Sequence, residues 1–160
     1  MQPAVLYYQK GGYIMTTPEH SDTAKLLREC DAGIKMGISS LGELIPKVNS
    51  PALEEILTQS RMEHENLRAE AEMQLNKLKD GGKNPNPMAA AMSTLKTNLK
   101  MMNGSDHDAA SLAANGCTMG IKKLNQYLDK YAAADSESKQ LTSRIISAEE
   151  KLTAELERYL

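Results

Sequence analysis

Apolar residues recur along most of this 160-residue chain at intervals of three and four positions, the spacing of one face of an α-helix. Pro, Gly and residues that can cap helices interrupt this pattern. Between the interruptions we predict long helices near residues 18–48, 51–79, 106–133 and 136–159, and a short helix near 87–102. Pro46 should kink or end the first helix, because proline has no main-chain N–H. The predicted N-caps are Thr17, Ser50, Asn86, Ser105 and Asp135.

The connections between these helices predict their topology. Residues 80–105 separate the second and third long helices. That connection is far longer than the roughly two to eight residues typical of antiparallel neighbours in a bundle. It is long enough to run the full height of a bundle and to carry the short helix on the outside. We therefore predict an all-α four-helix bundle built from two antiparallel hairpins joined by a long crossover.

Composition supports a helical fold and excludes some functions. The chain has ten Met but no Phe or Trp, which suits closely packed helices better than a sheet. Its net charge of -2 comes from mixed signs, so we expect no nucleic-acid partner. No apolar run approaches the roughly 20 residues that span a bilayer, so we expect no membrane partner and a cytoplasmic location. Cys30 and Cys117 should be reduced and buried.

The first 14 residues are expected to lie outside the fold. Lys10-Gly11-Gly12 can be written as the codons AAA-GGA-GGA, a purine-rich sequence of the kind that bacterial ribosomes bind before a start codon. Tyr13-Ile14 would then be the spacer before Met15. We therefore expect a bacterial protein whose native start is Met15. Residues 1–14 would be a translated upstream stretch or a disordered tail, and residues 15–160 a single domain.

The two halves of the chain resemble each other. Residues 32–41, AGIKMGISSL, and 115–124, NGCTMGIKKL, share the pattern Gly-x-x-Met-Gly-Ile-x-x-Leu. Residues 63–75, EHENLRAEAEMQL, and 148–160, AEEKLTAELERYL, also match at several Glu, Leu and Ala positions. The sequence therefore predicts one helical hairpin used twice, with two pseudo-symmetric copies.

Four glycines of the repeated pattern lie inside predicted helices, where each costs about 1 kcal/mol relative to Ala. A close approach of two helix backbones would offset this cost. We therefore predict that the first and third long helices cross at these glycines, near a pseudo-two-fold axis. The four are Gly33, Gly37, Gly116 and Gly120.

Two related hairpins, four helices of matched length and a long crossover resemble the ferritin-like superfamily. The resemblance covers residues 15–160 and is closest to small bacterial ferritin-like proteins of unknown function. Di-iron members carry a Glu on each of two helices and a Glu-x-x-His pair on each of the other two. Here Arg61 stands three residues before His64, and the fourth helix has no His. The third helix offers Ala113, Gly116 and Cys117 where a carboxylate is needed, so the di-iron ligand set is incomplete.

Three polar residues nevertheless fall on the apolar stripes of predicted helices. They are Asp31, His64 and Glu149, and Glu149 occupies the position equivalent to His64 in the second hairpin. Buried carboxylates need partners, so these side chains are expected to contact one another. They could form a structural polar network or a reduced metal site for iron, manganese or zinc, or they could face solvent.

These observations favour a non-enzymatic scaffold or protein-interaction module without a cofactor, acting with a second copy as a homodimer or with another protein. The alternative is a metal-binding or redox protein that uses Asp31, His64 and Glu149. The superfamily resemblance also leaves open a packaging role in bacterial stress or sporulation.

Overall fold

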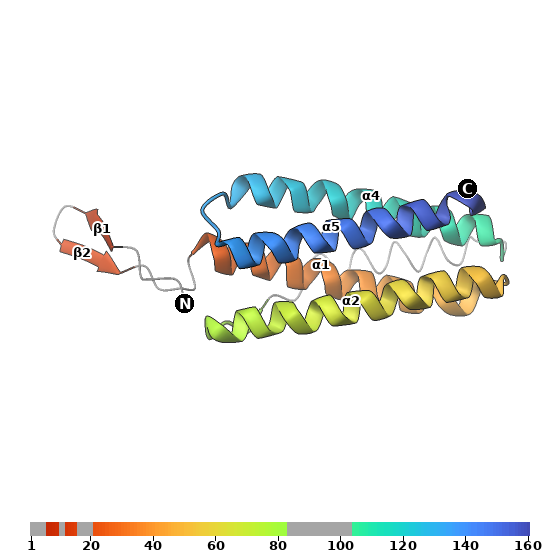
Figure 1. Ribbon diagram of the computed structural model, residues 1–160, viewed down its shortest axis with the longest axis horizontal. Coiled ribbons are helices and arrows are strands. Elements are labelled where there is room, and N and C mark those ends of the chain that lie inside the picture. The colour runs from red at the N-terminus through yellow and green to blue at the C-terminus, as the bar shows by residue number, and fades with distance from the viewer. Residues whose placement is uncertain (1–5, 10–11, 16–20, 83–103) are drawn as a thin grey trace.

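The computed structural model describes residues 6–9, 12–15, 21–82 and 104–160. Four long helices lie side by side along their length (Figure 1). They are α1 (Asp22–Leu44), α2 (Pro51–Lys77), α4 (Asp106–Lys130) and α5 (Ser136–Leu156). Short 3₁₀ turns, η2 (Ile45–Lys47) and η3 (Glu157–Tyr159), follow α1 and α5. The predicted all-helical fold with four long helices is thus confirmed, while the short helix expected near 87–102 lies outside the described residues.

Local capping signals set most helix boundaries. The hydroxyls of Ser50 and Ser105 and the carboxylate of Asp135 each accept a hydrogen bond from a main-chain N–H in the first turn, as predicted. The α1 helix starts later than predicted, because Ser21 is its N-cap and accepts a hydrogen bond from the N–H of Ala24. Pro46 ends the α-helical part of α1 and lies within the 3₁₀ turn.

The N-terminal stretch contains a short hairpin. Strands β1 (Leu6–Gln9) and β2 (Gly12–Met15) pair antiparallel, with Leu6 opposite Met15 and Gln9 opposite Gly12. Tyr and Ile favour extended backbone, which accounts for strands in this stretch. The expectation that residues 1–14 are a translated upstream stretch or a disordered tail outside the fold stays a prediction. The assignment of Met15 as the native start stays a prediction.

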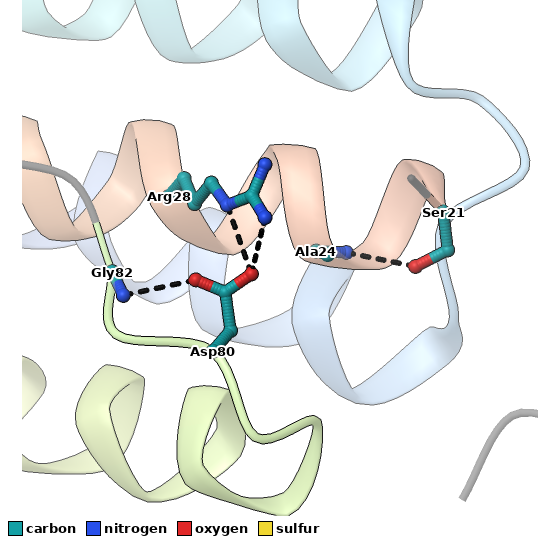
Figure 2. Close-up of polar contacts among 5 residues, drawn as sticks. All are labelled: Ser21, Ala24, Arg28, Asp80 and Gly82. Atoms are coloured by element: carbon teal, nitrogen blue, oxygen red, sulfur yellow. Dashed lines mark hydrogen bonds and ion pairs between the residues drawn. The ribbon is translucent and has the colours of Figure 1, made fainter. Parts of the chain in front are cut away.

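The helix ends show how the two hairpins connect. At one end of the bundle, Asp80 follows α2 and accepts two hydrogen bonds from Arg28 of α1, at 2.9 and 2.5 Å, while its other oxygen accepts the N–H of Gly82 (Figure 2). The α4 helix begins at the opposite end (Figure 1). There Asp106 accepts main-chain hydrogen bonds from Asn49 and Ser50. The end of α2 and the start of α4 thus lie at opposite ends of the four helices.

Each hairpin also binds the turn of the other hairpin through an aspartate. The first residue of α4, Asp106, accepts the N–H of Asn49 in the α1–α2 connection at 2.7 Å. The first residue of α1, Asp22, accepts the N–H of Ala133 in the α4–α5 connection at 3.0 Å. Asp106 follows Asp22 by the same number of residues as Ala133 follows Asn49. The turns are therefore held by equivalent interactions.

The core consists of two apolar clusters, one toward each end of the bundle. One contains Leu27, Leu75 and Leu141, and the other contains Leu44 and Leu57, among other buried residues. A polar layer at mid-bundle lies between them. In the part of the chain that the structure describes, no helix combines the length and apolar character needed to cross a membrane.

Candidate functional site: a buried polar layer

His64 and Glu149 form an ion pair in the middle of the bundle. His64 lies near the centre of α2 and Glu149 lies within α5, so the pair joins the two hairpins. The distance from His64 Nε2 to Glu149 Oε1 is 2.8 Å. The His64 side chain is only 1% exposed and that of Glu149 is 14% exposed. This is the predicted contact between the two equivalent positions of the hairpins.

The hydrogen-bond partners of His64 fix how many protons the pair holds. Nδ1 lies 2.7 Å from the carbonyl oxygen of Ser60, which can only accept, so Nδ1 must donate. Nε2 faces a carboxylate oxygen of Glu149, and an ionised carboxylate also only accepts. Both ring nitrogens therefore donate, which makes His64 a cation bound to the anion of Glu149. Loss of this proton breaks one of the two bonds.

The electrostatics of the pair agree with this proton count. Burial favours neutral His64, but the hydrogen bond and negative charge of Glu149, with smaller contributions from Ser60 and Glu63, raise the pKa of His64 above its ordinary 6.5. Burial likewise favours neutral Glu149, but the hydrogen bond and charge of His64 and a hydrogen bond from Cys117 lower its pKa below the ordinary 4.5. The charged pair is therefore the stable form near neutral pH.

Cys117 of α4 completes the polar layer. Its thiol hydrogen-bonds to Glu149 and also interacts with Thr153. Burial, together with the negative charge of Glu149, raises the pKa of the Cys117 thiol, so the thiol stays protonated. Cys117 is a free, buried cysteine, as predicted, and has the character of an unreactive hydrogen-bond donor. The sequence predicted that Cys117 is buried but did not indicate its contact with Glu149.

Two of the four repeated glycines lie beside this pair, and one of them, Gly37, makes room for it. A Cβ atom on Gly37 would lie 3.0 Å from His64 Cδ2 and 3.3 Å from His64 Nε2. A Cβ atom on Gly120 would lie 3.8 Å from Glu149 Cδ. Gly37 and Gly120 occupy equivalent places in the repeated pattern, and so do His64 and Glu149. Each hairpin therefore places a glycine beside its own polar side chain.

The predicted helix crossing at the glycines is wrong. Among the described residues, nothing lies within 4 Å of a Cβ atom built on Gly33 or Gly116. At Gly37 and Gly120 the nearest atoms belong to side chains of α2 and α5, and no backbone of another helix is among them. The missing Cβ atom makes space for a polar side chain at Gly37, whereas a Cβ atom on Gly120 would be in ordinary contact with Glu149. Gly33 and Gly116 have no packing role among the described residues.

Asp31 does not join the polar layer. It is buried in α1, and its Oδ2 atom lies 2.7 Å from Nζ of Lys35, one turn along the same helix. The backbone of Gly82 also lies against this carboxylate, because a Cβ atom there would be 2.5 Å from Asp31 Oδ2. The structure thus brings His64 and Glu149 together but places Asp31 near the end of α2. The predicted mutual contact of all three residues is not formed.

The donor set does not fit a metal centre. Among the residues that the structure describes, no three His, Cys, Asp or Glu side chains are grouped so that they could hold a metal ion. His64 and Glu149 offer two donors, and each is the hydrogen-bond partner of the other. A protein site for zinc uses at least three protein ligands, and a di-iron site uses about six. The layer is better suited to a structural ion pair.

No protein-family model, curated protein or solved structure matches this chain. Outside the short N-terminal hairpin, the described fold is helical, with four long helices and a histidine–glutamate pair at its centre.

Proposed function

We propose that this protein is a ferritin-like four-helix bundle without a metal centre, which acts through its surface as a non-enzymatic scaffold or protein-interaction module. The observation that carries this proposal is the composition of the central layer. The ferritin-like resemblance implies metal ligands at the level where His64 and Glu149 lie. Here those two side chains neutralise each other between apolar clusters.

The directions of the helices support the ferritin-like part of the proposal. The α1 and α5 helices run one way, and α2 and α4 run the other way (Figure 1). Two hairpins joined by a crossover have this arrangement. The equivalent contacts of Asp22 and Asp106 with the opposite turns support a duplicated hairpin. A bacterial origin and a cytoplasmic location belong to the same proposal and rest on the sequence alone.

Metal analysis tests the proposal directly. The full chain would be purified without chelator, incubated with iron(II), manganese(II) or zinc(II), desalted and measured by elemental analysis. We expect much less than one metal ion per chain, with no difference between the wild type and His64→Gln. A stoichiometric metal that is lost in His64→Gln, but kept in the exposed control variant His107→Gln, would overturn the proposal.

The interaction role needs a positive test. A photoreactive amino acid would be placed, one position at a time, at exposed sites on each long helix, and adducts would be formed in the source cell. We expect discrete adducts from at least one helix face. If no position on the four helices gives an adduct, the protein does not act through these surfaces.

A further inference from the structure

The outer face of α2 carries a continuous row of exposed residues without charge. Met62 and Met73 are 52% and 58% exposed, which is unusual for large apolar side chains. Exposed polar or small residues lie between and beyond them at intervals of three and four positions. We call this row the α2 stripe, and it consists of Gln59, Met62, Asn66, Ala69, Met73 and Asn76.

The spacing of the α2 stripe suits a partner helix. Alternating intervals of three and four produce a straight seam with an average period of 3.5, as in helices that pair along their length. Asn and Gln in such a seam weaken the contact but restrict its register. A helix docked here would form a weak, reversible interface of defined alignment.

The charges beside the stripe indicate which helix fits. Along one flank the order is Arg61, Glu65, Arg68, Glu72, and within the chain Arg61 pairs with Glu65 and Arg68 with Glu72. This order alternates positive and negative. When a second copy of α2 is placed antiparallel, Arg61 lies opposite Glu72 of that copy. Glu65 then lies opposite Arg68 of the copy, so the flank is complementary to itself.

The same alignment suits the rest of the face. It places Met62 about two residues, roughly 3 Å along the helix, from the level of Met73 of the second copy, a distance that flexible methionine side chains span. On the other flank Glu63 would lie opposite Glu70 of the copy. Both carboxylates already hold a cation from α5, because Lys151 pairs with Glu63 and Arg144 pairs with Glu70. That flank is therefore close to neutral.

We propose that the α2 stripe is the docking surface for a second copy of this chain, in an antiparallel two-fold dimer whose axis passes between the two α2 helices near the level of Leu67. A closed two-fold dimer needs a self-complementary patch, and the order of charges around the stripe provides one. The inference rests on the proposed function only in that the protein acts through its surface. It names the partner for one face of that surface.

Charge exchange tests the dimer and its direction together. Arg61→Glu/Arg68→Glu makes the flank wholly acidic, and Glu65→Arg/Glu72→Arg makes it wholly basic. Sedimentation velocity over a concentration series should show a reversible dimer for the wild type. Each variant alone should dimerise about tenfold or more weakly, because exposed ion pairs contribute roughly 0.2–1 kcal/mol each. An equimolar mixture of the two variants should form the dimer again.

A cross-linking experiment checks the register. Met62→Cys/Met73→Cys should form disulfide-linked dimers on mild oxidation, because positions 62 and 73 of opposite chains would lie within about two residues of the same level, roughly 3 Å along the helix. Met62→Cys alone should form few, since its two copies lie several turns apart. Met119→Cys, on α4 and 67% exposed in the wild type, is the matched control and should also form few.

Three results would overturn the inference: a wild type that stays monomeric at every concentration, charge variants that dimerise like the wild type, or Met62→Cys linking as well as the double variant. A monomer that still forms adducts with other proteins in cells would leave the proposed function standing. A stoichiometric metal bound by His64 would remove the proposed function but not the dimer.

Discussion

At the scale of single residues, the central feature is the His64 ring, which is protonated on both nitrogens. The ring donates to the Ser60 carbonyl and to the Glu149 carboxylate, so neither nitrogen can lose its proton without leaving two acceptors face to face. Such a pair contributes little compared with an apolar core, but breaking it is costly because a buried charge is left alone. The pair should therefore affect how stability depends on pH.

We expect the stabilisation from this pair to be greatest between about pH 4.5 and 6.5 and to decline on both sides. The pKa of His64 is raised, so its contribution is complete below 6.5 and is lost as pH rises through the raised value. The pKa of Glu149 is lowered, so its contribution is complete above 4.5 and is lost as pH falls through the lowered value. Urea unfolding from pH 4 to 9 would measure it.

The control for this measurement is His64→Gln/Glu149→Gln, which keeps polar groups of similar size at both positions but removes both titrating groups. The difference in free energy of unfolding between the wild type and this variant should peak at mildly acidic pH. A difference that is constant with pH, or that grows toward pH 9, would show that the pair is not a cation bound to an anion.

At the scale of elements, the repeated glycines of α1 and α4 differ in their surroundings. Gly37 is tightly packed, whereas Gly33 and Gly116 have open space around them among the described residues. We expect Gly33→Ala and Gly116→Ala each to raise the free energy of unfolding by up to about 1 kcal/mol, since Ala favours helix and nothing described lies within 4 Å. Gly37→Ala should lower it, because a Cβ atom 3.0 Å from His64 Cδ2 displaces the ring from its hydrogen bonds.

The matched comparison is Gly120→Ala, whose Cβ atom would make an ordinary contact of 3.8 Å with Glu149 and should behave like Gly33→Ala. Thermal or urea unfolding of the four single variants would separate these outcomes. Equal stabilisation by Gly37→Ala and Gly33→Ala would mean that Gly37 does not set the position of His64.

The elements also show which features the sequence could predict. Helix starts at Ser50, Ser105 and Asp135 were predictable because a cap and its partner N–H lie within one turn. The start of α1 was placed at Thr17 instead of Ser21, because both positions offer a hydroxyl before an acidic first turn and local sequence does not rank them. Boundaries set by neighbouring residues are predictable, and boundaries with two equivalent local candidates are not.

The site was predictable only in part, for a geometric reason. Helical periodicity placed Asp31, His64 and Glu149 on buried faces, and all three have low exposure. Periodicity does not give the level of a residue along the bundle. Asp31 precedes Gly37, the neighbour of His64, by six residues, which is about 9 Å of helix. The role of Gly37 could not be predicted either, because it depends on a side chain from another helix.

At the scale of the whole molecule, the two hairpins hold each other through matching contacts at three levels. Asp22 and Asp106 bind the opposite turns at the two ends, and the His64–Glu149 pair joins α2 to α5 in the middle. At this pair, the equivalent positions of the two hairpins carry different residues, His64 in the first and Glu149 in the second. Two identical hairpins would place like charges there, whereas the present sequence places opposite charges.

This arrangement predicts that the two residues can be exchanged. His64→Glu should place two carboxylates together and Glu149→His should place two imidazoles together, and each change should cost about 3 kcal/mol through loss of a buried partner. The double variant His64→Glu/Glu149→His restores an opposite pair. A histidine at position 149 also has the carbonyl of Ile145 four residues earlier, as His64 has that of Ser60.

Urea unfolding of the wild type, both single variants and the double variant forms a complete thermodynamic cycle. We expect the double variant to recover more than half of the summed loss of the singles. Full recovery is not expected, because Cys117 contacts Glu149, whereas Ile34 holds the place equivalent to Cys117 in the first hairpin and has no thiol to donate. If the losses simply add, the two sides of the central layer are not interchangeable, and the proposed duplication does not extend to the core.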